Sequence, residues 1–151
     1  MPYDALCKVI YCEDNKMAYS QATKVKDEHI DFQGIVDGLY YPHYMEKVRH
    51  DFMREANNID IVKASEEGKN YVLLSYEMRF KNSLKKGDDI DITCELKPIS
   101  ALKFGFYQKI IANGKVCAEA DFVATCVPSG GGRPFIPDEL KAILDTLLKS
   151  E

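Results

Sequence analysis

The sequence predicts an α+β domain in which an antiparallel sheet of about five strands wraps around one long central helix, followed by a short C-terminal helix. Apolar residues recur at helical spacing from about residue 39 to residue 56. From residue 74 to residue 126 they instead alternate with polar residues, which is typical of strands with one buried face. At 151 residues the chain has room for one full-sized core, so we expect a single domain over residues 1–151.

Two alternating segments precede the helix. The weak alternation of Leu6, Lys8 and Ile10 indicates a short leading strand, ended by a turn at residues 13–15. Residues 17–26 alternate well and predict a full strand.

The long helix begins near Leu39 and ends near residues 57–58. Pro42 fixes its start, because proline is tolerated in the first helical turn, where its missing N–H has no partner in any case. The expected apolar face carries Tyr41, Tyr44, Met45, Val48, Phe52 and Ala56, and the polar side carries Lys47, His50, Asp51 and Arg54. We interpret the polar stretch 63–70 as a loop.

Four further strands and a terminal helix complete the predicted domain. The inward-facing strand residues are Leu74, Tyr76, Met78 and Phe80; Ile90, Ile92, Cys94 and Leu96; Phe104, Phe106 and Ile110; and Val116, Ala118, Ala120, Phe122, Ala124 and Cys126. Asn113-Gly114 predicts a type I′ hairpin. The small residues Ala118 and Ala120 leave space for a helix to lie close. Pro137 and Asp138 start the terminal helix.

Composition excludes several classes of protein. The net charge is −4 and no basic block interleaves with aromatic residues, which argues against nucleic-acid binding. We expect no membrane span and no signal peptide, because no long apolar run or basic leader occurs. The five cysteines form no CxxC pair, so we expect reduced thiols and a cytoplasmic protein.

Asp31 is the leading candidate for catalysis. It lies in a glycine-containing loop that leads into the long helix, whose first N–H groups point back toward that loop. A carboxylate beside free amides at the positive end of a helix is suited to hydrolysis. The alternative is a structural role, since aspartates before helices are commonly caps. His29 and Asp31 supply only two candidate metal ligands, and no phosphate-binding or nucleophile-elbow motif occurs, so we expect neither metal nor cofactor.

The segment HIDFQGIVDGLYYPHYMEKVR, residues 29–49, resembles the active-site segment of hotdog-fold acyl-CoA thioesterases of the 4-hydroxybenzoyl-CoA thioesterase-like family. The positions that match are Asp31, Gly34, Val36, Tyr41, Glu46 and Arg49, and residues 132–137 match the family's Gly-Arg-Pro-x-x-Ile-Pro tail. The chain departs from the family at Ile35, where several relatives have His, and at Asp37-Gly38.

The resemblance implies the hotdog fold and hydrolysis of a fatty or aromatic acyl-CoA without a cofactor. Asp31 would be the catalytic carboxylate, and the backbone amides of Gly38 and Leu39 would stabilise the oxyanion. Gly34, Val36, Tyr41 and Arg133 are the expected substrate-binding residues. The resemblance also implies a homodimer or homotetramer in which two sheets join edge to edge.

Two other functions stay open. The chain could hydrolyse acyl-carrier-protein thioesters, although such an enzyme would present a larger basic docking face than this acidic sequence offers. It could also bind acyl thioesters without hydrolysing them, because the loop histidine of several relatives is missing. For two helix residues we expect structural roles: Glu46 as a non-catalytic carboxylate, and Arg49 in an ion pair with a carboxylate.

Overall fold

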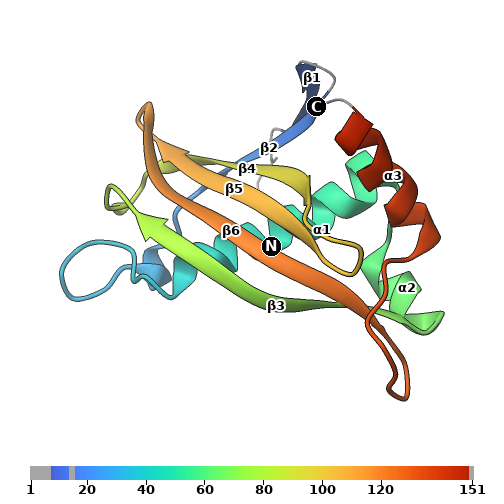
Figure 1. Ribbon diagram of the computed structural model, residues 1–151. Helices are drawn as coiled ribbons and strands as arrows, with labels where there is room; N and C mark the ends of the chain where they lie inside the picture. The colour runs from blue at the N-terminus through green and yellow to red at the C-terminus, as the bar shows by residue number, and fades with distance from the viewer. Residues whose placement is uncertain (1–7, 14–15, 150–151) are drawn as a thin grey trace.

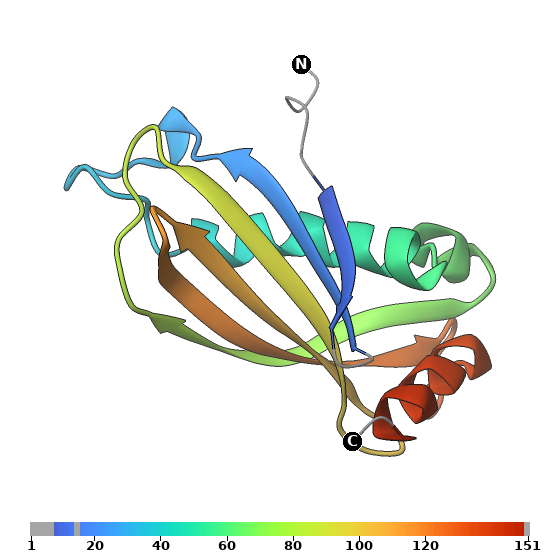
Figure 2. The same ribbon diagram turned by 90° about the horizontal axis from the view of Figure 1, so that it is seen from above.

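The computed structural model describes residues 8–13 and 16–149. Six antiparallel strands form one curved sheet in the order β1-β2-β4-β5-β6-β3, and the long helix α1 lies along one face of it (Figures 1 and 2). The elements are β1 Lys8–Glu13, β2 Lys16–Lys24, the short 3-10 helix η1 Asp27–His29, α1 Tyr40–Asn57, α2 Ile61–Glu66, β3 Lys69–Phe80, β4 Asp89–Pro98, β5 Phe104–Ala112, β6 Lys115–Pro128 and α3 Asp138–Lys149.

This arrangement confirms the expected hotdog architecture. The sheet has six strands because the weak leading segment does form β1, which pairs with β2 from Lys8 to Glu13. Leu6 of that segment and residues 14–15 of its turn lie outside the described residues.

The polar stretch 63–70 is not a loop, so that prediction is wrong. Its first half belongs to α2, and its last two residues open β3. The carboxylate of Asp60 nucleates this short helix, because its Oδ1 accepts hydrogen bonds from the amides of Val62 and Lys63 at 3.0 and 3.1 Å. Gly68, with φ of 85°, then turns the chain into the strand.

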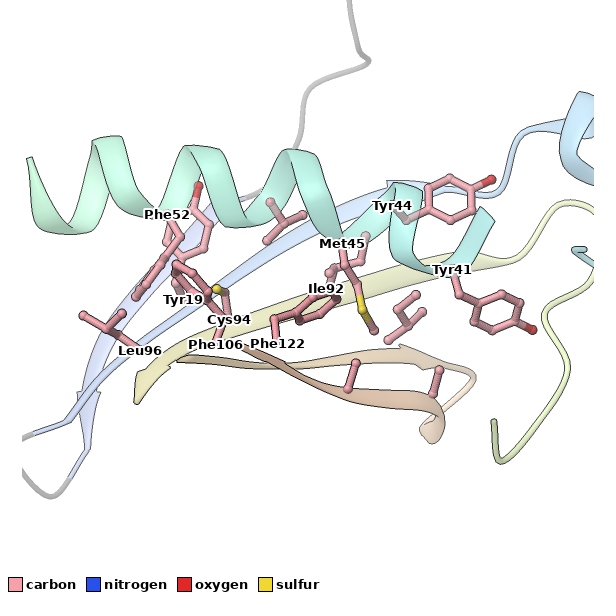
Figure 3. Close-up of a cluster of buried hydrophobic side chains, with 14 of the residues drawn as sticks. Tyr19, Tyr41, Tyr44, Met45, Phe52, Ile92, Cys94, Leu96, Phe106 and Phe122 are labelled. Carbon is pink, nitrogen blue, oxygen red and sulfur yellow. The ribbon is translucent and has the colours of Figure 1, made fainter. Parts of the chain in front are cut away.

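The boundaries of α1 agree with the sequence. The helix begins at Tyr40, two residues before Pro42, and ends where Asn58 adopts the left-handed conformation. Its apolar face packs against β4, β5 and β6 (Figure 3). As expected, Ala118 and Ala120 on β6 are fully buried.

The polar side of α1 is less exposed than its sequence suggests. Asp51 is buried against β2, where Gln21 Nε2 donates to its carboxylate at 2.8 Å, and Lys47 and Arg54 form ion pairs with it at 2.6 and 2.8 Å. Burial alone would raise the pKa of Asp51, but these donors outweigh it and hold the pKa at about 2. A charged network therefore fixes α1 on the β2 side.

Candidate active site

The segment between η1 and α1 is a miniature hairpin. Ile30 pairs with Val36, and the amide of Asp31 donates to the carbonyl of Ile35 at 2.8 Å. The amide of Gly34 donates back to the Asp31 carbonyl at 3.0 Å, and Gly34 has φ of 85°. Asp31 therefore occupies the first position of a tight turn, and Gly34 supplies the left-handed residue that such a turn requires.

Only one of the two carboxylate oxygens of Asp31 accepts a hydrogen bond among the described residues. The Oδ1 of Asp31 accepts a hydrogen bond from the amide of Gln33 at 2.7 Å, so its structural role lies in the hairpin turn and is not the helix cap that the sequence left open. Within residues 8–13 and 16–149, no hydrogen bond reaches its Oδ2. One oxygen orients the side chain, and the other remains available for chemistry.

The start of α1 is organised by Asp37. Its carboxylate accepts from the Leu39 amide at 2.9 Å, and its carbonyl accepts from the Tyr40 amide at 3.0 Å. Across the described part of the chain, the amide of Gly38 has no such partner, and Gly38 is exposed. Two amides were expected to stabilise the oxyanion. The Gly38 N–H is free to do so, whereas the Leu39 N–H already donates to the Asp37 carboxylate.

Val36 and Tyr41 lie beneath the hairpin rather than at its surface. They are only 2% and 3% exposed, and both bind the backbone of Leu84. The Val36 amide donates to the Leu84 carbonyl at 2.8 Å, and the Tyr41 hydroxyl accepts from the Leu84 amide at 3.1 Å. Burial raises the pKa of Tyr41, and the charge of Asp31 adds to the effect. Within the chain these residues hold the hairpin in place.

Phe80 lies beside the candidate site, which alternation along β3 did not predict. Alternation assigned Phe80 to the buried face, yet it is 58% exposed at the end of the edge strand β3. Its ring centroid lies 5.0 Å from that of Tyr41, and a Cβ on Gly38 would lie 3.6 Å from its Cζ. Together with Leu39, which is 79% exposed, Phe80 forms an apolar rim beside the open amide.

The structure does not bring Arg133 to Asp31 within one chain. Arg133 is exposed in the connection between β6 and α3, where Phe135 pairs with Cys126 near the end of β6. That connection and the Asp31 hairpin lie at opposite ends of the molecule (Figure 1).

His29 anchors the base of the hairpin. Its Nδ1 lies 2.6 Å from the Tyr44 hydroxyl, its ring stacks on Tyr40 at 3.9 Å, and its carbonyl accepts from the Asp37 amide at 3.1 Å. Burial lowers the pKa of His29; the charge of Glu28 opposes the shift, and His43 and Lys26 add to it. The neutral ring can accept the Tyr44 hydroxyl proton, because the Lys26 amide already donates to that oxygen at 3.1 Å.

The described residues, 8–13 and 16–149, show neither a metal-ligand cluster nor a membrane-spanning helix. No group of three or more His, Cys, Asp or Glu side chains there is arranged to hold a metal ion. None of the helices in that part of the chain combines the length and apolar character needed to cross a bilayer.

A hotdog sheet around α1, with a carboxylate hairpin leading into the helix, defines the class of protein. The family model of the thioesterase-like superfamily matches residues 25–144. The chain therefore belongs to the thioesterase-like superfamily, and the expectation of a thioester hydrolase is confirmed.

Individual relatives agree with this assignment. The chain is 23% identical to the acyl-CoA thioesterase YbgC of Haemophilus influenzae, over 82% of this chain and 92% of that protein. It is 26% identical to the chloroplastic acyl-acyl carrier protein thioesterase ATL3 of Arabidopsis thaliana, over 79% of this chain but only 63% of that protein. The structure of DHNA-CoA thioesterase from Staphylococcus aureus superposes with a TM-score of 0.77 at 13% identity, covering 87% of this chain and 89% of that one, which shows the shared fold.

We predict that His29 makes the protein less stable as the pH falls below neutrality. Its pKa is lowered in the folded state, so between the unfolded value of 6.5 and the folded value the unfolded chain binds more protons. Stability is therefore complete above pH 6.5 and declines as the pH falls toward the folded pKa. Urea unfolding at about pH 7 and about pH 5.5 measures this loss.

The variant His29→Gln should lose less stability than the wild type over the same pH interval. His43→Gln removes an exposed ring of α1 whose charge contributes to the lowered pKa of His29, so its pH dependence should lie between that of His29→Gln and that of the wild type. An undiminished pH dependence in His29→Gln would show that another group is responsible.

Proposed function

We propose that this protein hydrolyses acyl-CoA thioesters with Asp31 as its catalytic carboxylate. The observation that carries the proposal is that one short segment holds both a carboxylate with a free oxygen and a backbone amide with a free N–H. Asp31 is oriented through one oxygen and presents the other, and the open amide of Gly38 lies just before the start of α1. The likeness to YbgC, which is named an acyl-CoA thioesterase and is covered almost completely, supports CoA as the carrier.

The chemistry requires activation of water or direct attack on the thioester carbon. The free oxygen of Asp31 can act as a general base or as a nucleophile, and both routes generate negative charge on the carbonyl oxygen. The Gly38 N–H, at the positive end of α1, would donate a hydrogen bond to that oxygen and stabilise its charge. Donors of this kind act without reorganisation, because the backbone of the first turn is already fixed by Asp37.

The acyl-CoA would reach the site along the apolar rim of Leu39 and Phe80, with Gly34 at the tip of the hairpin. The substrate would make little contact with Val36 and Tyr41, since both side chains are buried. Arg133 would serve the active site of a partner subunit, because the connection between β6 and α3 that carries it lies at the other end of the molecule from the Asp31 hairpin.

We further propose a homodimer, or a tetramer of two dimers, joined through β3. This strand forms one edge of the sheet, and Leu74, Tyr76 and Phe80 on it are about half exposed. An unpaired edge that carries apolar side chains favours pairing with another strand.

Cys94, Cys117 and Cys126 are free thiols, which fits the reducing environment of the cytoplasm.

Acyl-carrier-protein thioesters are the second candidate substrates. The match to ATL3 favours them, although the chain spans less than two thirds of that protein. A panel of acyl-CoA and acyl-carrier-protein substrates, assayed by thiol release, distinguishes the two. A protein that binds these thioesters but releases no thiol would contradict hydrolysis altogether.

Substitution of Asp31 by Asn should lower kcat by about 100-fold or more, the range for loss of general-base catalysis. The fold should persist, because an amide oxygen can still accept from Gln33. Glu46→Gln, which alters an exposed carboxylate on α1, is the matched control and should retain near-normal turnover. Active Asp31→Asn combined with inactive Glu46→Gln would reverse the assignment.

Removing the Gly38 donor should also impair the chemical step. Gly38→Pro deletes the N–H, and we expect kcat to fall about 100- to 1000-fold, as for loss of an oxyanion donor. Gly38→Ala keeps the N–H, and its Cβ meets only ordinary contact with Phe80, so this control should stay active. Circular dichroism establishes that both variants are folded. If folded Gly38→Pro turns over normally, the donor lies elsewhere.

The dimer proposal predicts that Tyr76→Lys dissociates the protein and abolishes turnover, because it places a charge on the β3 edge. Leu148→Lys, which introduces the same charge at an exposed apolar position on α3, should leave the assembly intact. Sedimentation velocity with parallel activity assays measures both. An active species of 17.1 kDa would exclude a site shared between subunits.

A further inference from the structure

The ring of His29 ties the base of the Asp31 hairpin to the first two turns of α1. It is buried, and it stacks on the Tyr40 ring with the two centroids 3.9 Å apart and the planes 15° from parallel. Its Nδ1 lies 2.6 Å from the hydroxyl oxygen of Tyr44, one helical turn further along. The face and the edge of the ring thus both contact the helix, so a displacement of the ring would disturb the start of α1.

The backbone of His29 reaches the residues that hold the oxyanion donor. Its carbonyl accepts a hydrogen bond from the Asp37 amide at 3.1 Å, across the hairpin. Asp37 in turn accepts from the Leu39 amide at 2.9 Å through its carboxylate and from the Tyr40 amide at 3.0 Å through its carbonyl. Gly38, with its open N–H, lies between these bonded residues. One histidine therefore contacts both the helix and the loop that presents the donor.

The hydrogen bond between His29 and Tyr44 has a defined direction. The Tyr44 oxygen accepts from the Lys26 amide at 3.1 Å, and Nδ1 of His29 is the acceptor that the described residues offer to the Tyr44 proton. The neutral ring then carries its own proton on Nε2. Protonation of His29 would add a proton at Nδ1, and the hydroxyl would have to turn its proton away. This hydrogen bond therefore requires a neutral imidazole.

We propose that His29 and Tyr44 are positioning residues, and that their hydrogen bond, made with a neutral imidazole, aligns Asp31 with the open amide of Gly38 for turnover. His29 precedes Asp31 by two residues on one strand of the hairpin, and its carbonyl holds the residue before Gly38 on the other. Turnover is then lost when His29 takes up a proton. This inference rests on the proposed function and adds to it two residues that act through Asp31 and Gly38.

The groups around His29 determine the pH at which this loss occurs. The titratable and charged groups next to its ring come from η1, from the residue before η1 and from α1, and they are Glu28, Lys26, Tyr40, His43 and Tyr44. Burial lowers the pKa of His29; the charge of Glu28 opposes the shift, and His43 and Lys26 add to it. Burial also raises the pKa of Tyr44, so its hydroxyl keeps the proton that it donates. The neutral, bonded ring is thus complete above pH 6.5 and is lost as the pH falls through the lowered pKa.

Two substitutions of His29 separate the hydrogen bond from the ring. His29→Asn places an acceptor near the position of Nδ1 but does not titrate. We expect it to retain near-normal kcat at about pH 7.5 and to lose the decline in kcat toward about pH 5.5. His29→Phe keeps a ring that can stack on Tyr40 but offers no acceptor. Its kcat should fall roughly 10- to 100-fold at unchanged KM, the range for misplaced catalytic groups.

Tyr44→Phe removes the donor of the same hydrogen bond and should lower kcat by the same factor as His29→Phe. The double variant should be no slower than either single variant, because both remove one shared interaction. Tyr71→Phe is the matched control, since it removes a buried hydroxyl that has no hydrogen-bond partner among the described residues. It should keep both kcat and its pH dependence. Normal turnover in folded Tyr44→Phe would overturn the proposal.

Two charge variants leave the His29–Tyr44 hydrogen bond in place and should move the decline in kcat in opposite directions. Glu28→Gln removes a charge that raises the pKa of His29, so the decline should shift to lower pH. His43→Gln removes a charge that lowers this pKa, so the decline should shift to higher pH. Circular dichroism over the same pH range ensures that only folded protein is compared. A decline that neither variant moves, or one that persists in His29→Asn, would overturn the proposal.

Amide NMR of the protein without substrate separates this inference from the proposed function. In the wild type the Gly38 and Leu39 amide resonances should shift as His29 titrates, and in His29→Asn this shift should be absent. Such coupling without thiol release from any acyl thioester would overturn the enzymatic function and retain the positioning role. Thiol release with a Gly38 resonance that ignores the His29 titration, and with the same pH dependence in His29→Asn, would retain the enzyme and overturn the positioning role.

Discussion

The backbone of Leu84 is the point on which the candidate active site depends. Its carbonyl accepts from Val36 in the hairpin, and its amide donates to the hydroxyl of Tyr41 in α1. Leu84 is itself fully buried, so water cannot replace either bond. One residue in the connection between β3 and β4 thereby fixes the carboxylate-bearing hairpin relative to the helix that follows it. The free oxygen of Asp31 and the open amide of Gly38 keep their relation through this shared support.

Much of this fold could be read from the sequence, because the signals are local. Pro42 and Asn58 mark the two ends of α1, and alternation marks β4, β5 and β6. The helix α2 escaped prediction because it has only six residues and is held by the single cap Asp60. The segment around Asp31 was identified from its own residues, but its support by His29 and its neighbour Phe80 was not. Both depend on which distant side chains meet, and a periodic pattern carries no such information.

The buried charges on the two sides of α1 have different kinds of partner. On the β2 side, Asp51 has Lys47, Arg54 and Gln21 as donors, and the network is internally balanced. Toward β5 and β6, Arg49 has a neutral amide and aromatic rings, and the charge remains uncompensated. No carboxylate lies within ion-pair distance of Arg49 in residues 8–13 and 16–149, so the ion pair expected for it is wrong. A satisfied buried network rigidifies a core and specifies its packing, whereas a buried charge without an opposite partner is costly. One helix therefore carries a flank with balanced charge and a flank whose charge is met only by a neutral amide and aromatic rings.

The spacing of these contacts along the chain has a consequence for biosynthesis. The Tyr41–Leu84 bond joins residues 43 positions apart, and the Arg49–Gln108 bond joins residues 59 positions apart. The segment that carries Asp31 is therefore translated well before the residues that support it. Such non-local contacts close late, because loop-closure entropy must be overcome first. The hydrogen bonds that hold the Asp31 hairpin against α1 can therefore form only after the chain has been extended as far as Leu84, beyond the end of β3.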